Sequence, residues 1–339
     1  MKNNGMRKIR IAHIGCNKNS HAPQIFTSLK EQSELFEIVG YTLPEDEGVT
    51  GGAGRLAKFQ GYREMTLDEI LNDQSIEAVT VETEELRLTK YATLAIEHGK
   101  HVHMEKPGGI DPVAFENLIA AAKKQGTVLH LGYMYRYNPA VVALLRAVRA
   151  GELGEILSVE AQMNCHHHKE RRDWLGLHPG GMMFYLGCHL VDLILQIRGR
   201  PDAILPMNRQ TGAEGATGED FGMAVFQYAN GISFAKTSAF EYGGYLRRQL
   251  VVTGTRATVE IKPFEYGTEH QMYTDVRTYR EHAWGDSGQT QTFGPFNRYD
   301  AMMAAFAAMV RGECENPYTP DYELELYRTL MRCCGVSDV

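Results

Sequence analysis

No apolar segment of the sequence is long enough to span a membrane. The longest uniformly apolar run, Ala301 to Val310, has about half the length that a transmembrane helix needs, so we interpret it as a core helix. The N-terminal stretch contains basic residues but lacks the hydrophobic region and the small-residue cleavage site of a secretory signal peptide. We therefore expect a cytoplasmic protein with no membrane partner.

The sequence also lacks an excess of basic residues and any ordered pattern of cysteines. Lys and Arg number 35 against 42 Asp and Glu, which gives a net charge of −7, and the basic residues are scattered. Nucleic acid is an unfavourable partner, because phosphate binding requires a concentrated basic face. The six cysteines form no C-x-x-C pair and no regular framework, which indicates reduced thiols.

What is present is the composition of a globular protein with two domains. The chain has 339 residues, of which 43% are hydrophobic and 23% charged. In the first third, short apolar runs alternate with helical segments, which predicts a doubly wound parallel sheet over residues 1–130. The predicted strands are 8–14, 36–41, 78–81, 101–104 and 128–133, with 101–104 placed as the fifth strand and 128–133 as the sixth. The predicted helices are 23–32, 66–72, 90–98 and 112–125.

The pattern changes after Gly154. Five strand-like runs joined by short glycine-containing turns predict an open, mainly antiparallel sheet. These runs are 156–165, 220–228, 233–240, 248–254 and 257–262, and helices return at 299–311 and 323–334. Residues 131–339 are thus predicted to form a second domain, so the predicted fold class is α/β, with a doubly wound parallel sheet followed by an α+β domain with an open, mainly antiparallel sheet.

The first predicted βα turn begins at Gly15. A Rossmann domain cradles pyrophosphate there with a G-x-G-x-x-G pattern, of which only Gly15 is present; Asn17 and Ser20 occupy the other two places. Asn tolerates positive φ and Ser is small, so the turn can still form. The acid that holds the ribose diol at the end of the second strand is missing, and Glu45 or Asp46 would have to replace it. The preferred nucleotide therefore stays open.

Glu105 and Lys106 follow the strand 101–104 directly. Ligands of an open parallel sheet lie beyond the carboxyl ends of its strands, so both side chains are expected to face the ligand, with Pro107 fixing the turn. A lysine there can hydrogen-bond a substrate hydroxyl and stabilise a developing alkoxide. A surface ion pair between Glu105 and Lys106 is the other interpretation.

A second chemical cluster follows the glycines at 180 and 181, which suit a helix start. Tyr185 and His189 are four residues apart, on one face of an α-helix, and could converge on one ligand. The unperturbed pKa of a histidine side chain is about 6.5, so His189 is a candidate general base at neutral pH, and Asp192 could orient it. The alternative is a core histidine with Asp192 in a salt bridge.

Three consecutive histidines follow Cys165. On a strand only His166 and His168 would share a face, and no carboxylate or helical H-x-x-x-H spacing accompanies them. We predict no metal site, and expect these histidines to line a polar substrate pocket or to lie on the surface.

Taken together, these motifs resemble the glucose-fructose oxidoreductase, inositol dehydrogenase and MocA (Gfo/Idh/MocA) family. The resemblance rests on Glu105-Lys106-Pro107, on the stretch from Gly132 to Pro139, and on Gly180-Gly181 with Gly187-Cys-His189-Leu-Val-Asp192, and it extends from about residue 8 to residue 335. It implies an N-terminal Rossmann domain that binds NAD or NADP, and a C-terminal domain whose open sheet often forms the subunit interface. It further implies a homodimer or homotetramer.

The resemblance also implies roles for particular residues. Lys106 and His189 match the family's catalytic positions, and Tyr185 stands where members commonly carry an aspartate. The loop after the strand at 78–81 is Thr83-Glu84-Glu85 where members have a Thr-Pro-Asn type, and Leu88 stands where a histidine is common. The expected cofactor contacts are Gly15, Cys16, Asn17, Ser20, His21, Thr83, Glu105 and Lys106. The expected substrate wall, inferred from position, is Tyr135, Arg136, His166, His168 and Trp174.

The sequence thus predicts an NAD(P)-dependent oxidoreductase that acts on a hydroxyl of a sugar, cyclitol or glycoside. A close variant would oxidise a sugar at C3 with a nucleotide that stays bound. The alternative is a sugar- or nucleotide-binding regulatory protein of the same fold without turnover, which the altered glycine turn and Tyr185 favour.

Overall fold

The computed structural model describes residues 7–281 and 283–337 and divides the chain into two compact units. The first unit comprises residues 1–134 and 299–325, and the second comprises residues 135–298 and 326–339. This division differs from the predicted boundary at 130/131, because the chain returns to the first unit after the second sheet. Among the described residues, no helix is both long and apolar enough to cross a membrane.

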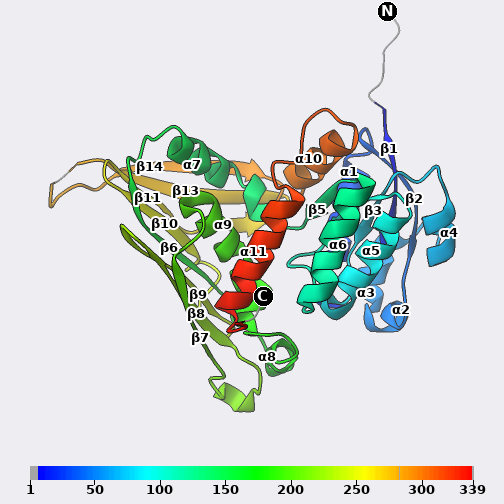
Figure 1. The fold of residues 1–339 in the computed structure, drawn as a ribbon, viewed down its shortest axis with the longest axis horizontal. Helices are drawn as coiled ribbons and strands as arrows, with labels where there is room; N and C mark the ends of the chain where they lie inside the picture. Colours follow the sequence, from blue (N-terminus) through cyan, green and yellow to red (C-terminus); the bar gives the residue numbers. More distant parts are fainter. Residues whose placement is uncertain (1–6, 282, 338–339) are drawn as a thin grey trace, which may run out of the picture. The chain divides into compact units, whose positions relative to one another are not determined.

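The first unit is a parallel sheet with helices on both faces (Figure 1). Its strand order is β2-β1-β3-β4-β5, and every pairing is parallel. The strands are β1 (Ile9–Ile14), β2 (Phe36–Thr42), β3 (Ala78–Val81), β4 (His101–Met104) and β5 (Leu129–Leu131). The helices are α1 (Ala22–Glu31), α2 (Glu47–Thr50), α3 (Ala53–Leu56), α4 (Leu67–Asn72), α5 (Leu88–Glu97), α6 (Pro112–Gln125) and α10 (Asp300–Val310), with short 3-10 turns η1 (Ala57–Phe59) and η2 (Glu85–Arg87).

The predicted fold class is confirmed, with one correction. In the part of the chain that the structure describes, the first sheet has five strands, so 101–104 is the fourth and 128–133 contains the fifth. The strands were easy to locate because a parallel sheet covered on both faces buries nearly every strand residue. Helix starts also followed local rules: Asp111 accepts hydrogen bonds from Val113 and Ala114 at the start of α6, with Pro112 at its first position.

The second unit is built on a nine-stranded, mainly antiparallel sheet. The order is β12-β13-β11-β10-β6-β9-β8-β7, with β14 paired to β13, and β6–β9 is a parallel pair. The strands are β6 (Ile156–Asn164), β7 (Ala203–Arg209), β8 (Phe221–Tyr228), β9 (Gly231–Ser238), β10 (Gln249–Gly254), β11 (Thr258–Ile261), β12 (Tyr266–Thr268), β13 (Gln271–Tyr279) and β14 (Gln289–Phe296).

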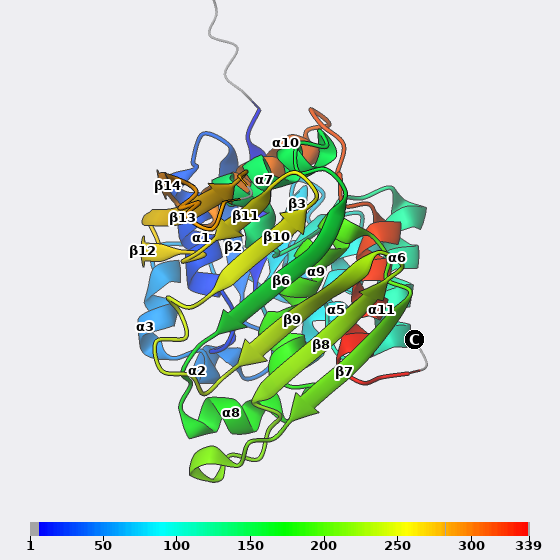
Figure 2. The ribbon, with the colours of Figure 1, turned by 90° about the vertical axis from the view of Figure 1, so that its left-hand side faces the viewer.

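Helices cover one face of this sheet. They are α7 (Pro139–Arg149), α8 (Lys169–Leu175), the π-helix η4 (Met183–Gly187) and α9 (Cys188–Arg198), together with short 3-10 turns η3 (Met134–Tyr137) and η5 (Ala213–Gly215). The helix α11 (Pro320–Cys333) ends in this unit. Figure 2 looks onto the opposite face, where strands β6 to β10 lie in front of α9. Side chains on the helix side, such as Val159, Ala161 and Ala235, are fully buried and form the core.

Candidate active site

The carboxyl end of β1 is a tight turn that requires glycine. Gly15 has φ +98°, and a Cβ atom there would lie 2.7 Å from both the backbone nitrogen and Cγ2 of Thr83. The first βα turn and the loop after β3 therefore approach each other closely. Burial raises the pKa of the Cys16 thiol to about 11, so this residue contributes its backbone rather than a thiolate.

Side chains of the turn and two acids satisfy the backbone N–H groups around it. The side chain of Asn17 accepts a hydrogen bond from the Asn19 N–H (2.8 Å), and the Ser20 hydroxyl donates to the Asn17 carbonyl (3.0 Å). The Cys16 N–H donates to Glu47 (2.7 Å) and the His21 N–H to Glu82 (3.1 Å). Asn17 and Ser20 thus stabilise the turn with side-chain hydrogen bonds that glycines at these positions could not make.

Glu105 and Lys106 lie at the carboxyl end of β4, as predicted, and both are buried. One Glu105 oxygen lies 2.5 Å from Nδ1 of His21, and the other lies 3.9 Å from Nζ of Lys106. Burial raises the pKa of Glu105, but His21 and Lys106 outweigh burial and lower it to about 2, so the carboxylate is ionised. The surface ion pair considered as the alternative is excluded, since the two side chains are only 4% and 2% exposed.

A third carboxyl group, Glu82, completes this edge of the sheet. It follows β3 and is 1% exposed, and its Oε1 has no hydrogen-bond partner among the described residues. Burial, reinforced by the negative charge of Glu105, raises the pKa of Glu82 well above its ordinary value. The glycine turn and this orphaned oxygen fit a dinucleotide, which needs a close backbone approach and polar partners at the carboxyl edge.

Three acidic residues follow β2, and they differ in burial and in their partners. Glu45 pairs with Lys90 (3.0 Å) and Arg87 (2.5 Å), and Asp46 is largely exposed beside Arg87. The next residue, Glu47, is 1% exposed and reaches the Gly15 turn. The prediction that Glu45 or Asp46 replaces the ribose-binding acid remains a prediction, and Glu47 is a further acid at this edge.

In the second unit, the predicted helix begins after the glycines but with a π-helical turn. Gly181 has φ +49°, and a Cβ atom there would lie 2.1 Å from the carbonyl oxygen of Glu219. The chain then forms the π-helix Met183–Gly187 before α9. The α-helical i,i+4 relation predicted for Tyr185 and His189 does not hold across this turn, because a π-helix has a wider period.

Tyr185 and His189 accordingly have different neighbours. The Tyr185 hydroxyl accepts a hydrogen bond from Arg171 (3.0 Å), and its ring meets the edge of Trp174 at 5.3 Å. The His189 ring, 1% exposed, meets Tyr135 at 4.9 Å in a T-shaped contact. The Tyr135 hydroxyl is itself held by Glu265 and Arg248, both at 3.1 Å, so this residue presents its ring.

Arg136 and Asp192 form a buried ion pair. The Arg136 guanidinium donates to both carboxylate oxygens of Asp192, at 3.0 and 2.9 Å, and the two side chains are 0% and 2% exposed. The salt bridge of Asp192 matches the alternative interpretation of this cluster, while the expectation that Asp192 orients His189 stays a prediction. Arg136 lies inside the unit, with a side chain that is 0% exposed.

The three histidines after β6 alternate as a strand would. His166 and His168 are exposed, and His166 stacks against Phe240 and Tyr242. His167 points inward to Tyr185, with ring centroids 6.4 Å apart, and burial lowers its pKa to about 4. Within residues 7–281 and 283–337, no group of three His, Cys, Asp or Glu is arranged to hold a metal ion.

Sequence reasoning missed several polar groups that surround the predicted residues. Glu82 had a signal, since an acid directly follows the short buried strand 78–81. Glu47 had only an acid-rich stretch, 45–47, in which any of three residues could serve. His167 and Arg171 had no spacing signal. The missed residues are Glu47, Arg55, Glu82, His167 and Arg171.

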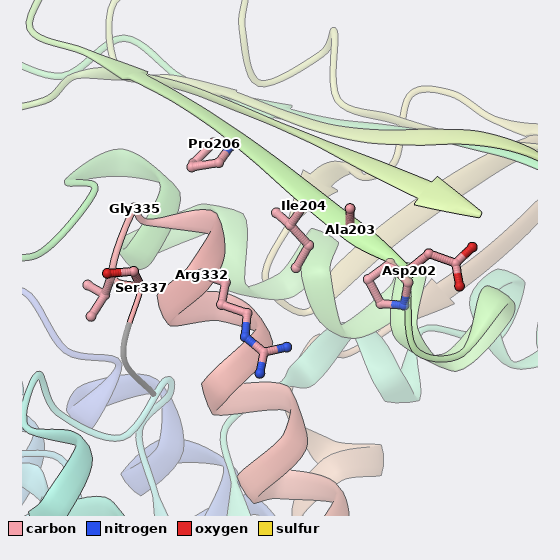
Figure 3. Close-up of a pocket in the computed structure, with 9 residues that line it drawn as sticks. Asp202, Ala203, Ile204, Pro206, Arg332, Gly335 and Ser337 are labelled. Carbon is pink, nitrogen blue, oxygen red and sulfur yellow. The ribbon is translucent and has the colours of Figure 1, made fainter. Parts of the chain in front are cut away.

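The second unit also contains a pocket of about 290 Å³ lined by residues at the start of β7 and the end of α11 (Figure 3). Its charged lining residues are Asp202 and Arg332. None of the predicted site residues lines it.

Comparison with known proteins connects these features to one family. Residues 8–133 match the description "Oxidoreductase family, NAD-binding Rossmann fold", and residues 141–260 match the "GFO/IDH/MocA C-terminal domain". The chain is 33% identical over 138 residues to "Uncharacterized oxidoreductase YhhX" of Escherichia coli, covering 41% of the chain and 40% of that protein. It is 28% identical over 180 residues to "scyllo-inositol 2-dehydrogenase (NADP(+)) IolW" of Bacillus subtilis, covering 52% and 48%.

Other relatives and solved structures extend this likeness. The chain is 25% identical over 200 residues to the bovine "Trans-1,2-dihydrobenzene-1,2-diol dehydrogenase", covering 57% of each. The matches to these curated relatives thus span about half of their length. The fold is that of an oxidoreductase from Thermotoga maritima (TM-score 0.78, 18% identity, 97% of this chain and 96% of that chain). The chain therefore belongs to the Gfo/Idh/MocA family of oxidoreductases, with an NAD-binding Rossmann domain.

Proposed function

We propose that the protein is an NAD(P)-dependent dehydrogenase or reductase that transfers hydride between the nicotinamide and a hydroxyl-bearing carbon of a sugar, cyclitol or glycoside. The observation that supports this proposal most directly is the position of Lys106. Its side chain is only 2% exposed and lies at the carboxyl end of β4. A buried cation at this edge is costly unless it serves a ligand or is paired. The family's catalytic lysine matches this position.

Different residues of the chain have different roles in the proposed reaction. Lys106 holds the substrate oxygen, with the ionised Glu105 keeping the ammonium in place at 3.9 Å. His189 takes the hydroxyl proton during oxidation and returns it during reduction. Tyr185 positions a neighbouring hydroxyl, and the rings of Trp174 and Tyr135 stack on the sugar face. A bound nicotinamide supplies the hydride acceptor or donor.

Replacing Lys106 tests this assignment. We expect Lys106→Met to lower kcat/KM by about a hundredfold or more, because the general-acid and charge-stabilising contribution of a positioned group is of this order. The matched control is Lys123→Met, which removes an exposed lysine of the same unit that pairs with Asp321. The measurement is the absorbance of reduced nicotinamide with a panel of sugars, sugar acids and inositols. Equal rates for wild type and Lys106→Met would remove the lysine from the mechanism.

A regulatory binding protein is the second candidate, and one observation favours it. The N–H groups of Cys16 and His21 donate to Glu47 and Glu82 instead of remaining available for phosphate. Titration of the purified protein with NADH and NADPH separates the two candidates. Nucleotide binding together with lysine-dependent turnover supports the enzyme; sugar binding with no response to either nucleotide supports the regulatory protein.

A further inference from the structure

We propose that Glu47 selects the nucleotide, and that its buried carboxylate makes the protein favour NAD(H) over NADP(H) by facing the ribose of the adenosine half. This inference rests on the proposed function, since it assigns a specificity to the nucleotide site proposed there. NAD(H) carries two hydroxyls on that ribose, whereas NADP(H) carries a phosphate in place of one of them.

The position of Glu47 is the first part of the argument. One carboxylate oxygen accepts the N–H of Cys16 at 2.7 Å, and the other accepts the N–H of Glu84, also at 2.7 Å. Cys16 follows Gly15 in the first βα turn, and Glu84 lies in the loop after β3. The carboxylate therefore bridges the carboxyl ends of two neighbouring strands, beside the turn where a Rossmann domain receives the ribose and pyrophosphate.

The segment that carries Glu47 is fixed to this turn at two further points. A Cβ atom on Gly51 would lie 2.7 Å from the Cys16 carbonyl oxygen, so the chain passes directly over the turn there. Arg55 donates to the carbonyl oxygens of Asn17 (2.6 Å) and Ser20 (2.9 Å). Contacts at residues 47, 51 and 55 hold α2 and α3 against the turn, so the carboxylate has a defined place.

The end of β2 explains why the acid comes from α2. Thr42 is the last residue of β2, and its carbonyl oxygen accepts the Gly15 N–H at 2.8 Å. Its side chain has no carboxylate, and neither has that of Leu43. The backbone contact between β2 and the turn is thus kept, while the acidic group is supplied five residues later.

The chemistry of the carboxylate gives the direction of selectivity. Each of its oxygens has a second acceptor position beyond the N–H that it already binds, so it can accept hydroxyl protons from a ribose diol. A phosphate in the same place brings like charge next to a desolvated carboxylate. Of the cations nearby, Arg87 pairs with Glu45 and Asp46, and Arg55 binds the carbonyl oxygens of Asn17 and Ser20 through one amino group.

The ionisation state of Glu47 gives a second, independent way to test its role in nucleotide selection. Burial raises its pKa to about 7, against the two N–H bonds and Arg87, which lower it, and with Asp46, which adds to the increase. The thiol of Cys16, whose N–H binds Glu47, stays protonated because burial raises its own pKa to about 11. Discrimination against NADPH should therefore be strong when Glu47 is ionised and weaken when it is protonated.

Binding measurements test the proposal without relying on activity. Fluorescence titrations with NADH and NADPH are made at pH values about one unit above and below the pKa of Glu47, on wild type, Glu47→Gln and the control Glu45→Gln, whose side chain is 34% exposed in the same loop. We expect wild type to bind NADH at least about tenfold tighter than NADPH at the higher pH and with a smaller ratio at the lower pH. Glu47→Gln should bring the ratio to within roughly threefold at both pH values, and Glu45→Gln should keep the wild-type ratio.

The outcomes separate this inference from the proposed function. Wild type that binds NADPH as tightly as NADH, or Glu47→Gln that retains the wild-type ratio, overturns the role of Glu47 while leaving the dehydrogenase intact. Wild type that binds neither nucleotide overturns the proposed function itself. Thermal unfolding shows whether Glu47→Gln folds. If it does not, the NADH and NADPH affinities of wild type at the two pH values decide the question. A ratio of the two affinities that is the same at both pH values contradicts the proposal.

Discussion

At the scale of single residues, the second unit shows a partner of Asp192 that sequence spacing did not predict. Asp192 was expected to orient His189 because the two are three residues apart, but its carboxylate is bound through both oxygens by Arg136 and also accepts from Gln196 at 2.9 Å. A guanidinium presents parallel donors that match a carboxylate, so a buried arginine within reach captures the acid. Sequence spacing alone could not show that Arg136, 56 positions away, would be this partner.

This ion pair makes a stability prediction. Asp192→Asn should lower the free energy of unfolding by about 3–5 kcal/mol, because it removes the negative charge that pairs with the buried Arg136 guanidinium. Urea denaturation followed by circular dichroism measures the change. Glu69→Gln is the control, since its pair with Arg63 is exposed and should hardly affect the denaturation midpoint. A midpoint for Asp192→Asn close to that of wild type would mean that Arg136 finds another partner.

At the scale of elements, the sequence located most strands of the first unit and the hairpins at the centre of the second sheet. Strands such as β3 and β4 are buried at nearly every position, and their short runs of Ala, Val and Met stand out between helices although Thr80, His101 and His103 interrupt them. The strand β14 escaped detection because most of its residues are exposed and polar, so the alternation of buried and exposed positions is absent. The π-helix before α9 was also not predicted, because it arises from a shift in the backbone hydrogen bonds that no particular residue pattern indicates.

The first sheet also contains a polar row that periodicity does not reveal. His13, Thr80, His103 and His130 are partners in register across β1, β3, β4 and β5, and all four are fully buried. Nδ1 of His13 lies 2.6 Å from the Thr80 hydroxyl, and Nδ1 of His103 lies 2.9 Å from Nδ1 of His130. The rings pack against Phe26 of α1 and Phe306 of α10. The row thus keeps neutral imidazoles inside an apolar layer.

This row predicts an acid-sensitive fold. Burial lowers the pKa of His13 to about 3 and that of His103 to about 4, whereas the unfolded chain titrates near 6.5. The unfolded state therefore binds more protons below pH 6.5, and stability is lost as the pH falls from there toward 4. The two histidines together should cost about 3–4 kcal/mol between pH 7 and pH 5. Urea denaturation of wild type and His103→Asn across this range measures it, and the variant should lose roughly half of the dependence.

The comparison with the variant isolates the histidines from other titrating groups. Glu47 and Glu82 have raised pKa values in the folded state, so their contributions grow as the pH falls and oppose the trend. These contributions are common to wild type and His103→Asn and cancel in the difference. An unchanged pH dependence in His103→Asn would show that the buried row does not govern acid stability.

At the scale of the whole molecule, the uncovered face of the second sheet predicts self-association. Leu205 on β7 and Ile232 on β9 are 54% and 58% exposed, and the half-buried Val225 and Phe234 lie in register with Leu205 across β8 and β9. An apolar sheet face with no covering helix is typical of a subunit interface (Figure 2). We propose that a second copy of the chain covers this face, giving a homodimer or a homotetramer.

Charge substitution on this face tests the assembly. We expect wild type to scatter light as a dimer or tetramer and Leu205→Lys/Ile232→Lys to scatter as a monomer, because a desolvated lysine at the centre of an apolar interface strongly opposes association. The control is Val113→Lys, at a side chain 65% exposed on α6 in the first unit, which should keep the wild-type mass. Thermal unfolding of each variant at low protein concentration checks that the fold is retained. A monomeric wild type would contradict the proposed assembly. A double variant with the wild-type mass would show that the subunits meet through another surface.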